Sequence, residues 1–160
     1  MATRQQELAK ELTTRADAAP SVEDLMSVMV GRLKERLPHF DWVGFYLLEK
    51  GQPGEEPVLV IGPYVGAITP HTRIPLNQGI CGAAASSGRT VIVDDVNADP
   101  RYLACSIDTK SEIVVPVVVK GEVVGELDVD SHTPAAFNAD DRQLLEHCAR
   151  LVGIYLEKTT

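Results

Sequence analysis

The stretch EIVVPVVVKGEVVGELDVD, from Glu112 to Asp130, decides the fold of this chain. It contains two β-branched runs, 112–119 and 122–130, on either side of Lys120-Gly121. Runs of this composition separated by a short glycine-containing loop are typical of an antiparallel β-hairpin. The sequence therefore predicts two long, adjacent strands near the C-terminal end of the chain.

The loop of this hairpin determines which side chains share a face. We predict a three-residue loop, 119–121, with Gly121 in the left-handed position of a bulged turn, which pairs Glu112 with Asp128. A two-residue loop would mix valines and carboxylates on one face. With the three-residue loop one face is wholly apolar, and the other carries four carboxylates, those of Glu112, Glu126, Asp128 and Asp130.

Three of these carboxylates, Glu112, Asp128 and Asp130, gather at one end of the predicted sheet. Like charges at neighbouring strand positions repel, so the cluster costs stability unless a cation neutralises it or one carboxyl keeps its proton. The pattern indicates a site for a cationic ligand or an acid, and a solvated sheet edge is the structural alternative. Oxygen ligands also suit calcium or magnesium, but no EF-hand spacing accompanies them, and we predict no metal site.

Helices are predicted at both ends of the chain, around a sheet. Helical spacing of leucines occurs around Leu8 and Leu12 and again from Ser21 to Pro38, and Asn138 begins a third helix over 138–158. Strands are expected over 42–48, 58–64, 72–75 and 90–93, with a short alanine-rich helix at 83–87. Terminal helices around an antiparallel sheet indicate an α+β fold. We interpret 1–160 as a single domain, with a helical segment at 1–38, the sheet and pocket at 42–130 and the C-terminal helix at 138–158.

The length and net charge of the chain limit which classes of binding partner we expect. The 160 residues suit one domain, and a formal charge of −8 would repel both a phosphate backbone and an anionic bilayer. We therefore expect no nucleic-acid and no membrane partner. No uncharged apolar run approaches the ~20 residues of a membrane helix, and the N-terminus lacks an apolar signal core, which predicts a cytoplasmic location.

The three cysteines lie in different settings. Cys81, Cys105 and Cys148 are an odd number without a CxxC pair, which favours neither a disulfide scaffold nor a zinc site. Cys105 lies in a polar loop near Lys110, where exposure and a nearby ammonium favour reactivity. Cys148 falls on the apolar stripe of the C-terminal helix, and we expect it to be inert.

Two further motifs allow a functional or a structural interpretation. Trp42 and Tyr46 share one face of a predicted strand, where they either wall a small cage or fill the core. The segment 79–82, Gly-Ile-Cys-Gly, opens a predicted helix. Its free N–H groups favour an anion and would lower the pKa of the Cys81 thiol, and the structural alternative is a tightly packed turn.

The motifs DWVGFYLLE, GPYVGAITPHTRIP, LNQGICGAA, DDVNADPRYLACS, SEIVVPVVVKGEVVGELDVDS and FNADD occur in this order. As a set they resemble the free methionine-(R)-sulfoxide reductase branch of the GAF domains, from Trp42 to the C-terminal helix. The resemblance implies a six-stranded antiparallel sheet with helices on one face and a ligand pocket on the other. It also implies reduction of free methionine-(R)-sulfoxide without a cofactor.

The resemblance assigns roles to individual residues. Cys105 would attack the sulfoxide sulfur, the oxygen would leave after protonation, and a sulfenic acid would remain on Cys105. A disulfide with a second cysteine and its reduction by a thioredoxin-type donor would follow. Carboxylates would hold the substrate ammonium group and assist the sulfoxide oxygen, and aromatic rings would contact its methyl end. The implied catalytic residues are Cys105, Cys81 and Asp130, and the implied substrate-binding residues are Trp42, Tyr46, Ile80, Gly82, Glu112 and Asp128.

One segment departs from the family pattern. Members commonly carry another cysteine just before the Arg-Ile-Pro segment, where this chain has Thr-Pro-His-Thr at 69–72. Either Cys81 or an external thiol would then have to resolve the sulfenic acid on Cys105. The alternative function is a GAF module that binds a small metabolite without converting it, and a homodimer through the terminal helices is compatible with both.

Overall fold

The computed structural model describes residues 1–103 and 107–159, and its strands form one antiparallel sheet. The order across this sheet is β3-β2-β1-β6-β5-β4. The strands are β1 (Trp42–Glu49), β2 (Val58–Val65), β3 (Arg73–Pro75), β4 (Val91–Val93), β5 (Ser111–Val119) and β6 (Glu122–Ser131). The helices are α1 (Arg4–Ala18), α2 (Val22–Arg36), α3 (Gly79–Ser87) and α4 (Ala139–Thr159), with a 3-10 turn at Val96–Ala98. The α+β prediction with a six-stranded antiparallel sheet is confirmed.

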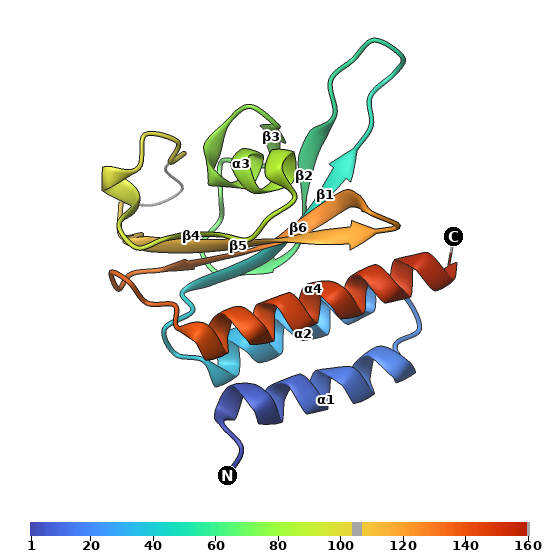
Figure 1. The fold of residues 1–160 in the computed structure, drawn as a ribbon, viewed down its shortest axis with the longest axis vertical. Coiled ribbons are helices and arrows are strands. Elements are labelled where there is room, and N and C mark those ends of the chain that lie inside the picture. The colour runs from blue at the N-terminus through green and yellow to red at the C-terminus, as the bar shows by residue number, and fades with distance from the viewer. Residues whose placement is uncertain (104–106, 160) are drawn as a thin grey trace.

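The helices divide unequally between the two faces of the sheet (Figure 1). α2 and α4 lie along one face, α1 packs on them from the side away from the sheet, and α3 lies on the opposite face. The main hydrophobic core fills the space between the sheet and α2 and α4. Its fully buried members include Leu25, Met29, Leu33, Phe45, Ile113, Leu127, Val129, Leu145, Cys148 and Val152.

Side-chain caps fix where the long helices begin. The Ser21 hydroxyl accepts a hydrogen bond from the backbone N–H of Asp24 at 3.1 Å, and Asn138 Oδ1 accepts one from the N–H of Asp141 at 2.8 Å. These caps satisfy N–H groups that have no partner within the helix. The predicted starts at Ser21 and Asn138 are thus confirmed. No helix in the described ranges combines the length and the apolar character that a bilayer crossing requires.

The turn of the β5–β6 hairpin differs from the prediction, although the faces do not. Lys120 and Gly121 form a two-residue turn with φ of 52° and 81°, and Val119 pairs with Glu122. The three-residue loop is therefore wrong. A β-bulge follows at once, because Val118 pairs with Val123 while Val117 pairs with Gly125.

The bulge restores the separation of the two faces. Its extra residue on β6 shifts the alternation by one position, so Ile113, Val115 and Val117 face away from the carboxylates despite the two-residue turn. Glu112 now pairs with Asp130, and Val114 pairs with Asp128. Glu112 and Asp128 still share a face, but they are diagonal neighbours and not the direct pair that we predicted.

Candidate active site

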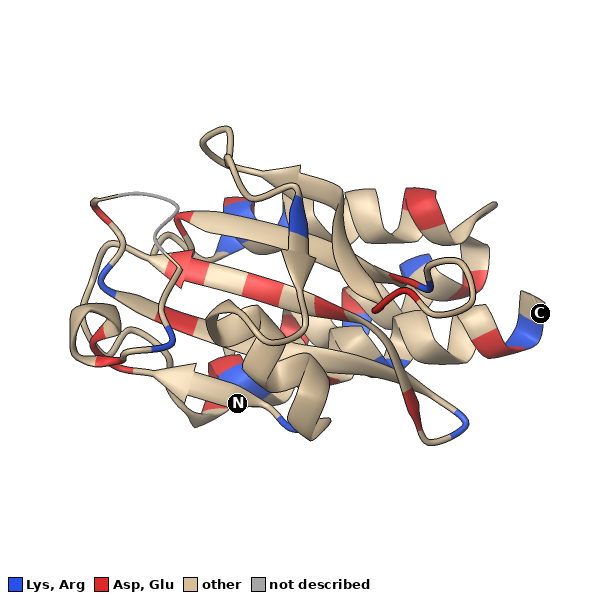
Figure 2. Cartoon of the chain, turned by 90° about the horizontal axis from the view of Figure 1, so that it is seen from above, with Lys and Arg blue, Asp and Glu red and all other residues tan. Residues whose placement is uncertain are grey.

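Four acidic side chains lie on the face of the sheet that α3 covers. Glu112 comes from β5, and Glu126, Asp128 and Asp130 come from β6. Their exposed fractions are 6, 0, 3 and 4 %. Figure 2 shows acidic positions along the central strands beneath α3. The solvated sheet edge is therefore excluded, because these carboxylates are buried.

The first strand sets two aromatic rings beside the acids. Trp42 pairs with Asp130, Gly44 with Asp128 and Tyr46 with Glu126. The Trp42 ring covers Gly44, where an added Cβ would stand only 2.4 Å from a ring carbon. Glycine at this position lets the ring lie flat along the strand.

Both rings are buried and bonded through their polar ends. Trp42 Nε1 donates to the carbonyl of Ala67 at 3.0 Å, and the Tyr46 hydroxyl donates to the carbonyl of His71 at 2.8 Å. Trp42 also stacks on Tyr64, with ring centroids 5.4 Å apart. The cage and the core interpretations of Trp42 and Tyr46 both hold in part. The rings belong to a small hydrophobic core, and they also border the cavities beside the acids.

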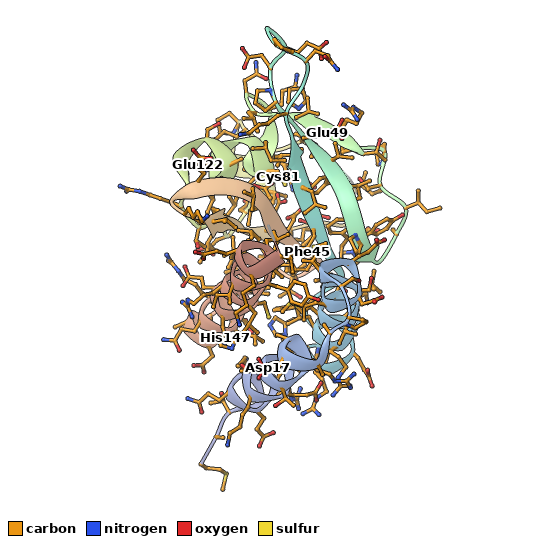
Figure 3. All side chains as sticks on the ribbon, turned by 90° about the vertical axis from the view of Figure 1, so that its right-hand side faces the viewer. Asp17, Phe45, Glu49, Cys81, Glu122 and His147 are labelled. Atoms are coloured by element: carbon orange, nitrogen blue, oxygen red, sulfur yellow. The ribbon has the colours of Figure 1, made fainter. Side chains whose placement is uncertain are left out.

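Cys81 points from α3 toward the carboxylates. Figure 3 shows its side chain between α3 and the sheet, with Phe45 on the side of the terminal helices. The thiol is 5 % exposed and donates to Asp128 Oδ2 at 3.5 Å. Burial, and then the charges of Asp128 and Glu126, raise the pKa of Cys81 well above its ordinary value. The prediction of a thiol with a lowered pKa at this helix start is wrong, because burial and the neighbouring carboxylates disfavour the thiolate.

The acids themselves have raised pKa values. Burial comes first for all four, and repulsion from Asp128 raises the pKa of Glu112 and Asp130 further. Asp128 Oδ1, Asp130 Oδ1 and both oxygens of Glu126 have no hydrogen-bond partner among the described residues. None of the ion pairs found there joins these acids to a lysine or arginine. The group can hold protons or accept a cation, as the sequence pattern indicated.

Two small cavities adjoin the cluster. The first, of about 10 Å³, is lined by five of the predicted site residues: Tyr46, Ile80, Cys81, Glu112 and Asp128. The second, of about 150 Å³, is lined by Trp42 and Asp130, together with residues of the 67–69 and 108–109 segments. A larger groove of about 550 Å³ beside α4 lies away from these acids. We place the site at the smaller cavities because the buried carboxylates converge there.

Two predicted site residues stand apart from this arrangement. Gly82 lines neither cavity, and a Cβ on it would lie 2.7 Å from the carbonyl oxygen of Leu76. Its absent side chain lets α3 pack closely on the chain that follows β3. Cys105 lies outside the described residues. The described chain before it reaches the site, since Leu103 lines the first cavity and lies over Gly79.

Three residues of the site were not predicted from the sequence. Glu126 was placed on the acidic face but not in the cluster, although strict alternation along β6 puts it there. His71 and Leu103 line the first cavity. Both residues lie inside motifs quoted from the sequence, but neither was given a role, because loops that are distant in sequence bring them to the sheet.

Comparison with known proteins gives a consistent picture. The profile of the GAF domain family matches residues 21–156. The chain is 40% identical over 111 residues to the free methionine-R-sulfoxide reductase of Escherichia coli, which spans 69% of this chain and 63% of the relative. It is 40% identical over 114 residues to the enzyme of the same name from Saccharomyces cerevisiae, spanning 71% of this chain and 61% of the relative. Less than two thirds of either relative's length is therefore matched.

The chain covers a larger share of two similar solved structures than of the two relatives above. The free methionine-R-sulfoxide reductase from Neisseria meningitidis in complex with its substrate has a TM-score of 0.86 at 33% identity. The match covers 96% of this chain and 88% of that one. The reduced form of the Staphylococcus aureus fRMsr has a TM-score of 0.86 at 32% identity, over 97% of this chain and 96% of that one.

Proposed function

The chain belongs to the free methionine-R-sulfoxide reductase family of GAF domains, and we propose that it reduces free L-methionine-(R)-sulfoxide to methionine with a cysteine nucleophile. One observation carries this proposal. Beneath α3 the fold buries four carboxylates beside a thiol and two aromatic rings, with no lysine or arginine paired to them among the described residues. A small ligand with an ammonium group and a thioether-like methyl end complements these groups.

The acids account for selection of the free amino acid. We expect Glu112, Asp128 and Asp130 to hold the substrate's ammonium group and to assist its sulfoxide oxygen. In a polypeptide the same nitrogen is an amide and carries no charge. A protein-bound methionine sulfoxide would therefore leave the buried carboxylates without a counter-charge, at a cost of several kcal/mol. Trp42 and Tyr46 would contact the methyl end, and Ile80 and Gly82 would position α3 against the ligand.

The chemical step assigned to Cys105 is a two-electron reduction of the sulfoxide. Its thiolate forms a bond to the sulfoxide sulfur, and Asp130 supplies a proton to the oxygen. Burial and the charge of Asp128 raise the pKa of Asp130, so it holds such a proton. A second proton lets the oxygen leave as water, which breaks the S–O bond. Water then attacks the Cys105 sulfur and breaks the S–S bond, so methionine leaves, one proton is returned, and Cys105 ends as a sulfenic acid that carries one oxygen.

Recycling would use Cys81 and an external dithiol. The Cys81 thiol condenses with the sulfenic acid, which forms a disulfide and releases water, and a thioredoxin-type donor restores both thiols. A disulfide needs Cα atoms within about 7 Å. This assignment is supported by Leu103, two residues before Cys105, which packs against Gly79, two residues before Cys81. Stoichiometric substrate is expected to produce a Cys81–Cys105 disulfide, detectable by non-reducing peptide mapping.

We also propose a cytoplasmic location and a homodimer formed through the terminal helices. Ile154 on α4 is 43 % exposed and offers apolar surface there. Light scattering of the purified chain measures its mass in solution, and a monomer at all concentrations would contradict the dimer.

The decisive experiment compares two cysteine variants. Cys105→Ser is expected to abolish loss of free methionine sulfoxide, assayed for R and S separately with dithiothreitol as reductant. Cys148→Ser is the matched control, because this thiol lies in the helix-side core and has a pKa raised to about 12 by burial. The control should turn over normally. A Cys105→Ser variant that keeps most of its turnover would reject the nucleophile, and binding without turnover in the wild type would favour the non-catalytic module.

A second experiment tests the acids. Asp128→Asn removes a charged hydrogen bond to the substrate, and Asp130→Asn removes the proton donor to the sulfoxide oxygen. In each variant kcat/KM should fall about ten- to a hundredfold, equivalent to roughly 1.5–3 kcal/mol. Steady-state kinetics at several substrate concentrations measure the change. Unchanged kinetics in both variants would mean that the acids do not contact substrate.

A further inference from the structure

The thiol and two of the buried acids converge on one point. Cys81, Glu112 and Asp128 each offer a ligand atom, and these three atoms all lie within 4.8 Å of one another. Cys81 Sγ and Asp128 Oδ2 are 3.5 Å apart. In a tetrahedral zinc site with Zn–S of about 2.3 Å and Zn–O of about 2.0 Å, sulfur and oxygen stand about 3.5 Å apart. This pair of atoms already has the spacing of two zinc ligands.

An unpartnered oxygen at the same place points to a cation. Asp128 lines the first cavity, is 3 % exposed, and its Oδ1 has no hydrogen-bond partner among the described residues. Buried polar atoms without partners are costly, and a cation at this point would lower that cost for Asp128, which supplies one of its ligands.

The cavity has room for one ion. Its volume of about 10 Å³ is close to that of a single water-sized sphere. An amino acid needs far more space, so substrate must displace surrounding groups to enter, whereas an ion need not. One thiolate with carboxylates suits zinc, because calcium and magnesium take oxygen ligands only.

We propose that Cys81, Glu112 and Asp128 form a binding site for one zinc-like divalent cation, which occupies the pocket in the absence of substrate and competes with the substrate's ammonium group. The ion binds the Cys81 sulfur as the thiolate, and the thiol proton is released to solvent. Metal binding depends only on the described geometry, whereas the competition also rests on the proposed function. Zinc would then inhibit turnover and shield Cys81 from oxidation.

Cobalt(II) is the probe for this site, since a thiolate bound to cobalt gives a charge-transfer band in the near ultraviolet. Titrating Co²⁺ into the reduced full chain should produce this band with a stoichiometry of one, and Zn²⁺ should remove it. Cys81→Ser should lose the band. Cys148→Ser, the buried thiol on the other face of the sheet, should retain it, and so should Cys105→Ser.

A carboxylate variant guards against misfolding of the thiol variant. Glu112→Gln keeps the thiol and should weaken Co²⁺ binding about tenfold or more. A band of wild-type strength in Cys81→Ser, or unchanged affinity in Glu112→Gln, would overturn the site. Absence of any band in the wild type at excess Co²⁺ would also overturn it.

Competition separates this inference from the proposed function. In Cys105→Ser, where substrate is not expected to oxidise Cys81, free methionine sulfoxide should raise the apparent Kd for Co²⁺ in proportion to its concentration. In the wild type, Zn²⁺ should raise the KM of turnover. If the chain binds cobalt through Cys81 but reduces no sulfoxide, the metal site is supported and the proposed function is wrong. If the chain reduces sulfoxide unaffected by Zn²⁺ and gives no cobalt band, the proposed function is supported and the metal site is wrong.

Discussion

The two faces of the sheet bury side chains of opposite character. Toward α2 and α4, residues such as Phe45, Leu127 and Val129 form a continuous apolar core. Toward α3 the same strands bury four carboxylates and a thiol. Apolar burial stabilises a fold by roughly 25 cal/mol per Å², whereas buried acids without partners reduce its stability. The contrast indicates that the apolar face stabilises the domain, whereas the acidic face lowers its stability in order to form a ligand site.

A buried carboxylate on the helix side shows that burial alone does not decide the direction of a pKa shift. Asp141, at the start of α4, is fully buried. Its oxygens accept from Gln5 Nε2 at 3.1 Å and from the N–H of Asn138 at 3.1 Å, and His39 Nε2 lies at 2.9 Å. Burial opposes the charged form, but these partners outweigh it and lower the pKa of Asp141. Hydrogen-bond donors therefore decide the charge of a buried acid in this fold.

The largest expected effect on stability comes from comparing substitutions at Phe45 and Tyr46, which are adjacent in β1 and face opposite sides of the sheet. Phe45→Ala should lower the free energy of unfolding by about 3–5 kcal/mol, because it empties a fully buried ring site in the helix-side core. Tyr46→Phe removes only the hydroxyl that bonds to His71, and should cost about 1 kcal/mol. Urea unfolding of both variants measures the difference. A larger loss for Tyr46→Phe than for Phe45→Ala would reverse the assignment of the two faces.

An intermediate effect is expected from Asp141→Asn. Losing charged hydrogen bonds should lower stability by about 1.5–3 kcal/mol near neutral pH. Because the folded pKa lies below that of the unfolded chain, the loss should be complete above about pH 4 and disappear as the pH falls further. Asp140→Asn, in the same helical turn, is the control and should cost less than about 1 kcal/mol. Equal losses in both variants across the pH range would show that the hydrogen bonds to Asp141 do not stabilise the fold.

The smallest effect should have the opposite sign. Glu126→Leu removes an unpartnered buried acid and should stabilise the chain by about 1–3 kcal/mol, measured with a chelator present. Burial raises the pKa of Glu126, so the wild type loses stability as the pH rises above the ordinary value near 4.3. The advantage of the variant should therefore be larger at about pH 8 than at about pH 5. Glu122→Leu, at the exposed start of β6, is the control; a destabilised Glu126→Leu would show that the acid is structurally satisfied.

Much of this architecture followed from local patterns. Alternation along 112–130 predicted both strands and their two faces, because successive side chains of a strand point to opposite sides. Caps at Ser21 and Asn138 predicted the helix starts, since their side chains act within one turn. The placement of Glu112 beside Asp128 and Asp130 also needed a register between the two strands. We predicted this register from a three-residue loop, and the chain reaches a similar one through a two-residue turn and a bulge.

The turn of the hairpin did not follow in the same way. Counting residues favoured a three-residue loop, whereas the chain makes a two-residue turn and corrects the alternation with a bulge. At Gly125, beside this bulge, β6 lies so close to β1 that an added Cβ would stand 2.6 Å from the carbonyl oxygen of Tyr46. This contact joins residues far apart in the chain, and no local pattern reports it.

The sequence by itself determined the strands, the faces and the acidic cluster, because all three arise from neighbours along one hairpin. Only the tertiary structure decided that the cluster is buried, because α3 covers it, and that Glu126 and Cys81 belong to it. It also decided the protonation of Cys81, for which a helix start predicted a lowered pKa and the fold produces a raised one. The reason is physical: burial and the charges of Asp128, Glu126 and Glu112 act through space, and their balance exists only when the sheet and α3 are brought together.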